Sequence, residues 1–283
     1  MKTFPGLLAA ICIQFLAVTP GLAGEDQAGE LVTIESGDLP IILSAPHGGR
    51  EIVPDVPVRV GRDVNQFKVL TDTRTAELTE KLADEIEQRL GKRPYVVIAR
   101  FHRKYIDANR PPQDAYESPA AKEVYDAYHT ALARARHEVI ERWGRGVLFD
   151  VHGQVSVPDS ILRGTRNGKT TTHLVDRFGR EALIGETSLF GQIASRGIPV
   201  VPAVGSTNLE PKGYNGGYIV GTYGSAQGGA LDAIQLEVGQ DLRKATAIPQ
   251  TAVHLADSIC GFAKEYLPQA EQRRAALRPD PGS

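Results

Sequence analysis

Two histidines and one glutamate follow apolar segments, each at the point where a buried strand is expected to end. His47 comes just after "PIILSA", His152 comes directly after "VLFDV", and Glu237 ends "AIQLE". Glycines stand close to all three, and because glycine has no side chain, solvent and ligands can closely approach the backbone there. Two neutral imidazoles and a carboxylate suit a divalent metal, above all one zinc ion per chain, with a coordination position left for water. This arrangement predicts a metal site.

Each residue also has a simpler interpretation. A single histidine near a strand end is more often a hydrogen-bonded or surface residue than a ligand, and only the equivalent placement of two favours a metal. Glu237 could be an ordinary charge at a sheet edge, although a carboxylate in an apolar strand needs a partner. The remaining histidines are less informative: His129, His137 and His254 fall in helical patterns as surface or packing residues, and His102 and His173 stay open.

A second polar cluster lies in "RFHRKYIDANRPP", directly after another apolar strand. Arg103 and Arg110 carry guanidinium groups, which bind carboxylates through two parallel hydrogen bonds, and Asn109 can add a neutral one. This favours a binding site for a carboxylate. The alternative is that Asp107 and Arg110 form a structural ion pair in a loop that prolines terminate.

Strand and helix patterns alternate along the chain and would position these residues. Strands are expected at 40–45, 95–100, 146–153 and 230–239, and helices at 71–92, 118–143, 177–194 and 250–266. Thr71 or Asp72 would cap the first helix and Gly91 would close it. We therefore expect one α/β domain with a mostly parallel or mixed central sheet and helices on both faces. Ligands bind such sheets beyond the carboxyl ends of the strands.

Composition narrows the class of protein further. The chain has 283 residues and a formal net charge of −2, and its lysines and arginines form no basic run, which argues against nucleic acid and membrane surfaces as partners. Residues 1–23 read as a secretory signal peptide and predict an exported, periplasmic or secreted protein. Residues 30–268 would form the catalytic domain and 269–283 an unpacked tail. Cys260 would then be alone and serve as a small buried hydrophobe.

Six segments together resemble the N-formylglutamate amidohydrolase family, whose members look like relatives of zinc carboxypeptidases and aspartoacylases: "SAPHGGR", "TDTRT", "RKYIDANRPP", "FDVHGQ", "NGGYIVGTYGS" and "LEVGQDLR". The resemblance implies a zinc carboxypeptidase-like fold. It also implies that His47 and His152 bind the metal and that Glu237 is the general base and acid. Asn109 and Arg110 would hold a substrate carboxylate, and Arg103 would polarise the scissile carbonyl.

The third metal ligand departs from the carboxypeptidase pattern. Those relatives carry a glutamate three residues after the first histidine, where this chain has Arg50. Asp72 is the preferred replacement, and Glu51 is the alternative.

The implied reaction is metal-assisted hydrolysis of an amide in a small carboxylate-bearing substrate, an N-acyl amino acid or a peptide. Tyr218, with Tyr214 or Tyr223, could contact substrate from "NGGYIVGTYGS", although a structural glycine-rich hairpin fits that segment equally well. Two alternatives remain: a peptidoglycan amidase or carboxypeptidase, and a non-catalytic exported protein that binds carboxylates. An intact Glu237 argues against the second, because a binding protein has no need of a base.

Overall fold

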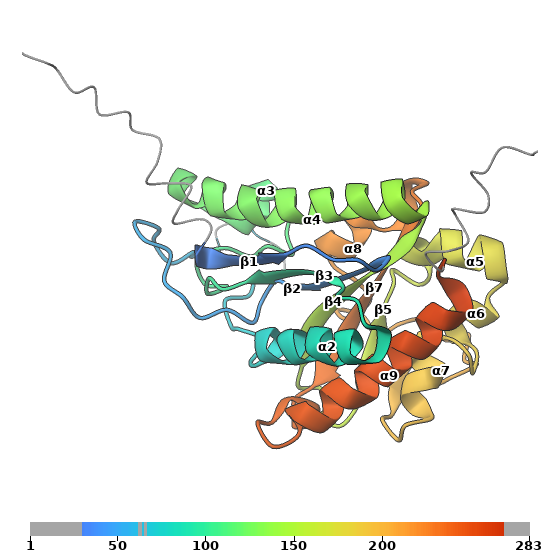
Figure 1. Cartoon of the computed structure of the whole chain (residues 1–283). Coiled ribbons are helices and arrows are strands. Elements are labelled where there is room, and N and C mark those ends of the chain that lie inside the picture. Colours follow the sequence, from blue (N-terminus) through green and yellow to red (C-terminus); the bar gives the residue numbers. More distant parts are fainter. Residues whose placement is uncertain (1–29, 62–63, 65–66, 269–283) are drawn as a thin grey trace, which may run out of the picture.

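A mixed seven-stranded sheet flanked by helices forms the domain (Figure 1). The computed structural model describes residues 30–61, 64 and 67–268, so the predicted signal peptide and tail lie outside the described residues. The strands are β1 (Val32–Glu35), β2 (Ile41–Ala45), β3 (Tyr95–Ala99), β4 (Gly146–Gln154), β5 (Ile161–Gly164), β6 (Val200–Val201) and β7 (Leu231–Gly239). The helices are α2 (Thr75–Leu90), α3 (Pro112–Ala115), α4 (Lys122–Trp143), α5 (Thr172–Phe178), α6 (Glu181–Ile184), α7 (Leu189–Ala194), α8 (Tyr218–Tyr223) and α9 (Ile248–Tyr266).

The order of strands across the sheet is β1-β3-β2-β4-β7-β5-β6. The four central strands β3, β2, β4 and β7 are parallel to one another, β1 and β5 pair antiparallel with their neighbours, and β6 runs parallel to β5. The predicted α/β domain with a mixed sheet is therefore confirmed. The carboxyl ends of β2, β4 and β7 lie next to one another at one edge, which is where ligands bind in this architecture.

Alternating side chains on the central strands feed two separate cores. Ile41 and Leu43 of β2 pack with the apolar residues of α2 and α9, whereas Ile42 points to the other face and packs with α4 and α8. This is the two-residue period of a strand buried on both sides, and it explains the continuous apolar runs in the sequence. Figure 1 shows α4 along one face and α2 with α9 along the other.

Two of the expected helices differ in the structure. Helix α2 begins at Thr75, after Arg74 with a positive φ of 65°, so neither Thr71 nor Asp72 caps it; Gly91 closes it as predicted. The span 177–194 is no single helix but parts of α5, α6 and α7, because Gly179 and Gly185 end the first two. Within the described ranges, every helix is too short or too polar to cross a membrane.

Candidate active site

Three neighbouring strands carry the residues that their sequence positions singled out. His47 lies two residues after the end of β2, His152 lies near the end of β4, and Glu237 lies near the end of β7. His152 and Glu237 stand opposite each other in the parallel register of β4 and β7. All three side chains are buried. The fold thus gathers them at one edge of the sheet, as the strand-end pattern predicts.

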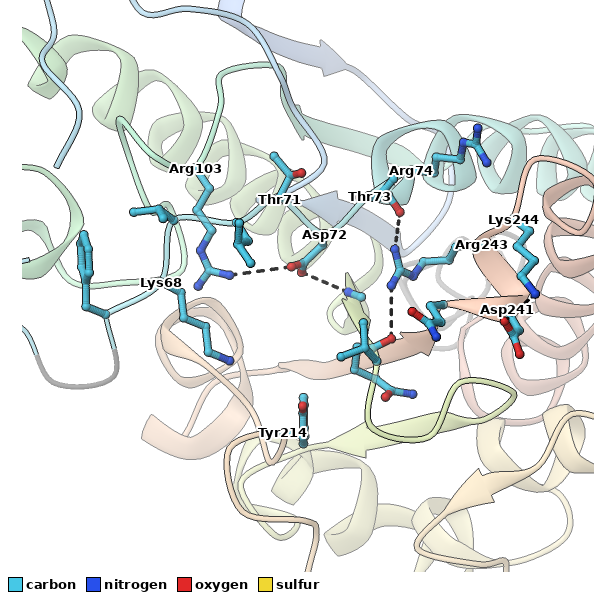
Figure 2. A pocket seen from close by; sticks show the side chains of 17 residues that line it. Lys68, Thr71, Asp72, Thr73, Arg74, Arg103, Tyr214, Asp241, Arg243 and Lys244 are labelled. Carbon is cyan, nitrogen blue, oxygen red and sulfur yellow. Dashed lines mark hydrogen bonds and ion pairs between the residues drawn. The ribbon is translucent and has the colours of Figure 1, made fainter. Parts of the chain in front are cut away.

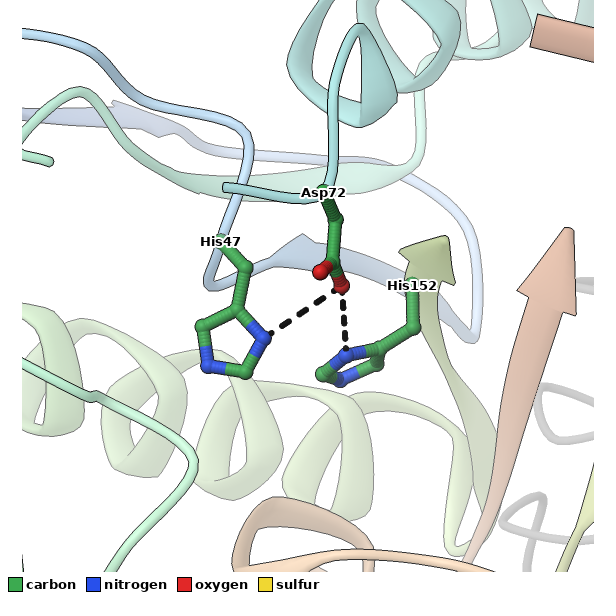
Figure 3. Close-up of side chains that lie close together, drawn as sticks. All are labelled: His47, Asp72 and His152. Atoms are coloured by element: carbon green, nitrogen blue, oxygen red, sulfur yellow. Dashed lines mark hydrogen bonds and ion pairs between the residues drawn. The ribbon is translucent and has the colours of Figure 1, made fainter. Parts of the chain in front are cut away.

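Asp72 completes a cluster with the two histidines (Figure 3). Its Oδ2 lies 3.4 Å from Nδ1 of His47 and 3.2 Å from Nδ1 of His152. The three candidate ligand atoms all lie within 4.8 Å of one another. Zinc bonds of about 2.0–2.1 Å place neighbouring ligand atoms of a tetrahedron about 3.3–3.4 Å apart. The two distances from Asp72 therefore match a zinc ion held by these three side chains, and the two histidine nitrogens lie within 4.8 Å of each other.

The far nitrogen of each histidine is held by a buried aspartate. Nε2 of His47 lies 2.7 Å from Asp107, and Nε2 of His152 lies 2.8 Å from Asp150. A carboxylate only accepts, so each Nε2 donates to its aspartate, and Nδ1, on the side of Asp72, is the nitrogen left to bind a metal. Nδ1 of His47 is buried and makes no hydrogen bond in the described structure. In metal sites, carboxylate–histidine pairs of this kind orient the imidazole toward the metal. The pairs His47–Asp107 and His152–Asp150 therefore also fit a metal centre.

Electrostatics at the cluster favour a bound cation. Burial alone would raise the pKa of Asp72, yet the neighbouring His152 and His47 hold it well below the ordinary value of an aspartate. Burial likewise disfavours a charged His152, but Asp150, Asp72 and Glu237 outweigh it and raise the pKa of His152 well above its ordinary value. The carboxylates thus stay ionised and attract positive charge to the imidazoles.

Local backbone contacts fix Asp72 at the cluster and leave Glu51 away from it. The N–H of Asp72 donates to the carbonyl of His47 at 2.9 Å, and Gly153 N–H donates to Oδ2 of Asp72 at 3.0 Å. Glu51 is exposed, pairs through its backbone beside Phe101, and lines a separate cavity. The geometry favours Asp72 over Glu51 as the third ligand.

Glu237 is placed to act as a base. Burial raises the pKa of Glu237 to about 7. Gln235 donates to its Oε1 at 2.6 Å, while the carbonyl oxygen of the Gln235 side chain accepts the N–H of Gly217 at 2.8 Å. A general base works best when its pKa lies near the working pH. Gln235 therefore connects the base to the loop that covers the site.

A cavity of about 320 Å³ opens over the cluster. It is lined by His47, Asp72, His152 and Glu237, by Arg103, Asn109 and Arg110, and by the loop 212–217. Arg103 is bound through two nitrogens to Asp107, at 2.9 and 2.7 Å, and its third nitrogen lies 3.7 Å from Asp72. The residues predicted to hold a carboxylate thus share a cavity with the candidate ligands.

Two predicted contacts take on structural tasks. The side-chain oxygen of Asn109 accepts the N–H of Ile219 at 2.8 Å, which ties it to the start of α8. The segment "NGGYIVGTYGS" contains this short helix rather than a hairpin. Tyr214 lines the cavity, whereas the Tyr218 ring packs 5.6 Å from that of His129, and Tyr223 bonds to His129.

Sequence patterns missed Asp150, Gln235 and the buried Arg243 of "LEVGQDLR". The guanidinium of Arg243 donates to the carbonyls of Val238 at 3.0 Å and Gln154 at 3.2 Å, and also to that of Thr73. These carbonyls belong to the ends of β7 and β4 and to the residue after Asp72. Arg243 therefore ties together the three segments that carry Glu237, His152 and Asp72.

The architecture and the cluster define an α/β protein with a mixed seven-stranded sheet and a candidate metal centre at the carboxyl ends of its central strands. Residues 39–124, which include His47, Asp72 and Arg110, match the family model of N-formylglutamate amidohydrolase. The N-formylglutamate amidohydrolase of Ralstonia eutropha JMP134 has a similar fold, with a TM-score of 0.57 and 16% identity over 87% of this chain and 99% of that one. A gene product of Agrobacterium tumefaciens, Atu2144, also has a similar fold, with a TM-score of 0.56 and 15% identity over 85% of this chain and 96% of that one.

A search of curated proteins found no significant match. At such low identity the two solved structures show a shared fold alone. Together with the family match they confirm the resemblance to the N-formylglutamate amidohydrolase family that the sequence motifs predict. The family match supports hydrolysis of an amide bond as the class of reaction.

Proposed function

We propose that this protein is a zinc-dependent amidohydrolase that cleaves the amide of an N-acyl amino acid or peptide-like substrate bearing a carboxylate. The observation that carries the proposal is the His47–Asp72–His152 cluster with a buried glutamate, Glu237, opposite His152. A metal-binding protein without catalysis needs the cluster but not a base with a pKa of about 7 in the same cavity.

His47, Asp72 and His152 would hold the zinc, and a bound zinc acidifies water and polarises a carbonyl. Glu237 takes the proton of the attacking water and returns it to the leaving amine. Since Gln235 holds Oε1 of Glu237, the proton is carried on Oε2. Arg103 stabilises the oxygen that becomes negative, because Asp107 fixes its guanidinium at the cavity wall.

Arg110 would bind the carboxylate of the amine product, with the amide nitrogen of Asn109 beside it. Both residues line the cavity over the cluster, and the Nε of Arg110 lies 4.0 Å from Asp107, which orients the guanidinium. This fixes the scissile amide over the metal ligands. A peptidoglycan amide remains the second candidate substrate, and muropeptides belong in the same panel.

Export is part of the proposal and rests on the pattern of residues 1–23. Cell fractionation and mass determination of the mature amino terminus test it. Cleavage after Ala23 is the expected result.

The decisive experiment replaces Glu237 by glutamine, which keeps the shape of the side chain and removes its ability to accept a proton. Asp232→Asn is the matched control, because Asp232 lies at the other end of β7 and is equally buried, 5% exposed against 6% for Glu237. Zinc content, melting temperature and kcat are measured on the same preparations with a panel of N-acyl amino acids.

We expect Glu237→Gln to keep zinc and fold and to lose about 10²–10⁴ in kcat, the usual contribution of a positioned base. The control should keep its kcat. An unchanged kcat in Glu237→Gln with normal zinc content contradicts the assigned base. Full activity after complete removal of zinc contradicts the metal-dependent mechanism itself.

A further inference from the structure

The cavity over the cluster continues into a second, larger cleft of about 870 Å³. The two share Lys68, Asp72, Arg103, Gly153 and Tyr214 along their boundary. Figure 2 shows Lys68, Arg103 and Tyr214 on one side of this cleft and Arg243, Asp241 and Lys244 on the other, with Asp72 between them. A volume of this size lies in the range of ligand sites and exceeds that of the cavity over the cluster.

The cleft lies on one particular side of the candidate metal ligands. Asn109 and Arg110, the proposed carboxylate site, line only the smaller cavity. The larger cleft opens from the side of Asp72 and Gly153. If Arg110 binds the amine product, the group across the scissile bond points past Asp72 into the cleft. A formyl group adds a single carbon and its oxygen and leaves this cleft empty.

Exposed apolar side chains flank the cleft. Leu70 is 79% exposed and Val155 is 65% exposed, and they reach the cleft from the segments before α2 and after β4. Large apolar side chains at the wall of a cleft beside a reaction site are a common mark of ligand binding. They suit the aliphatic stem of an extended substrate.

Charge in the cleft is predominantly positive. Arg243 is buried and donates only to backbone carbonyls among the described residues, so its charge lacks a bonded carboxylate. The ammonium of Lys68 lies over the Tyr214 ring, 5.9 Å from its centre. Lys244 is bound to Asp241 at 2.7 Å. A wall with surplus positive charge attracts an anionic group.

From this geometry we propose that the cleft binds the acyl side of the substrate and selects an acidic peptidyl group. The inference rests on the proposed function and names its substrate class: a peptide amide with a carboxylate on each side of the scissile bond. The amine side binds at Arg110, and the acidic side chain of the acyl residue lies in the cleft that contains Lys68 and Arg243.

Three amides with the same amine product test the proposal: N-formyl-glutamate, N-acetyl-glutamyl-glutamate and N-acetyl-glutaminyl-glutamate. The last two differ only in the charge of the acyl side chain. With the zinc-loaded protein we expect kcat/KM for the acidic peptide to be at least about tenfold higher than for the formyl compound. It should also be at least about threefold higher than for the neutral peptide.

Leu70→Glu places a negative charge at the mouth of the cleft, and Leu70→Gln makes the same change of shape without charge. Leu209→Glu is the matched control, because Leu209 is 77% exposed and lines a different cavity. Leu70→Glu should lower kcat/KM for the acidic peptide about tenfold and change that for the formyl compound less than twofold. Leu70→Gln removes the apolar contact without adding charge, so it should lower kcat/KM for the acidic peptide less than Leu70→Glu does. Leu209→Glu should change neither value by more than twofold.

Preference for the formyl compound, or for the neutral peptide over the acidic one, overturns the inference while leaving the proposed function intact. An equal loss on all three amides in Leu70→Glu also overturns it. If none of the amides is hydrolysed, the proposed function fails. The inference about the cleft is then tested separately, by measuring the binding of the two peptides by calorimetry. Tighter binding of the acidic peptide that Leu70→Glu weakens then supports the cleft, and equal binding of both rejects it.

Discussion

Asp150 offers the sharpest test of the metal centre, because it contacts neither the proposed metal nor the substrate. It is fully buried, and its two oxygens accept from Nε2 of His152 at 2.8 Å and from the hydroxyl of Ser44 at 2.5 Å. Asp150→Asn keeps the size of the side chain and replaces one oxygen by an NH₂ group. If that group faces His152, Nε2 must accept, the ring proton moves to Nδ1, and the lone pair for the metal is lost.

The alternative rotamer of the amide keeps an oxygen on His152 but removes the charge that makes the imidazole a strong ligand. Loss of such an outer partner typically weakens metal binding by about 10- to 100-fold. At a zinc concentration that is 100 times the wild-type Kd, zinc stabilises the fold by about 2.7 kcal/mol. A Kd raised 100-fold reduces this to about 0.4 kcal/mol, so the zinc-induced rise in melting temperature falls from about 5–11 °C to about 1–2 °C.

Zinc affinity is measured by competition with a chelator, and melting curves are recorded with and without zinc. Ser44→Ala serves as the control, because it removes the other partner of Asp150 and leaves the carboxylate on His152. We expect a much smaller change of Kd in this control. An Asp150→Asn protein with wild-type Kd and an unchanged zinc-induced shift would refute the assignment of His152 as a ligand through Nδ1.

Three further predictions test other parts of the molecule. Arg110→Ala should lower kcat/KM about 10- to 100-fold at unchanged zinc content; an equal loss on a substrate whose carboxylate is an amide contradicts the carboxylate site. Arg243→Met leaves three carbonyls without their donor and should lower the free energy of unfolding in urea by about 3–5 kcal/mol; a loss below about 1 kcal/mol contradicts the structural tie. Burial lowers the pKa of His129 to about 4. Below about pH 6.5, its ordinary pKa, the unfolded chain therefore binds a proton at this residue that the folded chain does not bind until about pH 4. Stability should therefore fall by about 2–3 kcal/mol from pH 7 to pH 4, and His129→Gln should flatten this dependence in denaturation curves; an unchanged slope argues against a buried neutral ring.

Strand-end reasoning located much of the site because the fold places β2, β4 and β7 side by side and parallel. His47, His152 and Glu237 could be recognised from their own neighbours in sequence, since an apolar run and a following glycine need no tertiary information. Asp150 carried a usable signal as well. It lies two residues before His152 on one strand, so the two share a face, and a carboxylate on that face is a natural partner for the ring.

Asp72 shows where local reasoning stops. Before a helical pattern, an aspartate is read as an N-cap, because that is its commonest local role. Here the turn that contains Arg74 in a left-handed conformation starts the helix later, and the carbonyl of His47 holds the backbone of Asp72 beside the histidine. The turn is local, but the contact with His47 joins residues far apart in sequence. The short strands β5 and β6 were also missed, because four and two residues give too little periodicity to detect.

The charge balance of the centre explains why these residues need one another. Asp72, Asp107 and Asp150 each have an oxygen within 3.4 Å of a histidine nitrogen. Arg103 pairs with Asp107, and Arg110 lies 4.0 Å from Asp107. An excess of buried negative charge is costly unless a cation joins it. Asp150, Asp72 and Glu237 accordingly raise the pKa of His152 well above its ordinary value, against the effect of burial. Because the far nitrogens are already fixed by Asp107 and Asp150, the nitrogens left to bind a zinc ion are those on the side of Asp72. The same carboxylates that raise the pKa of His152 thus prepare the cluster for a divalent metal.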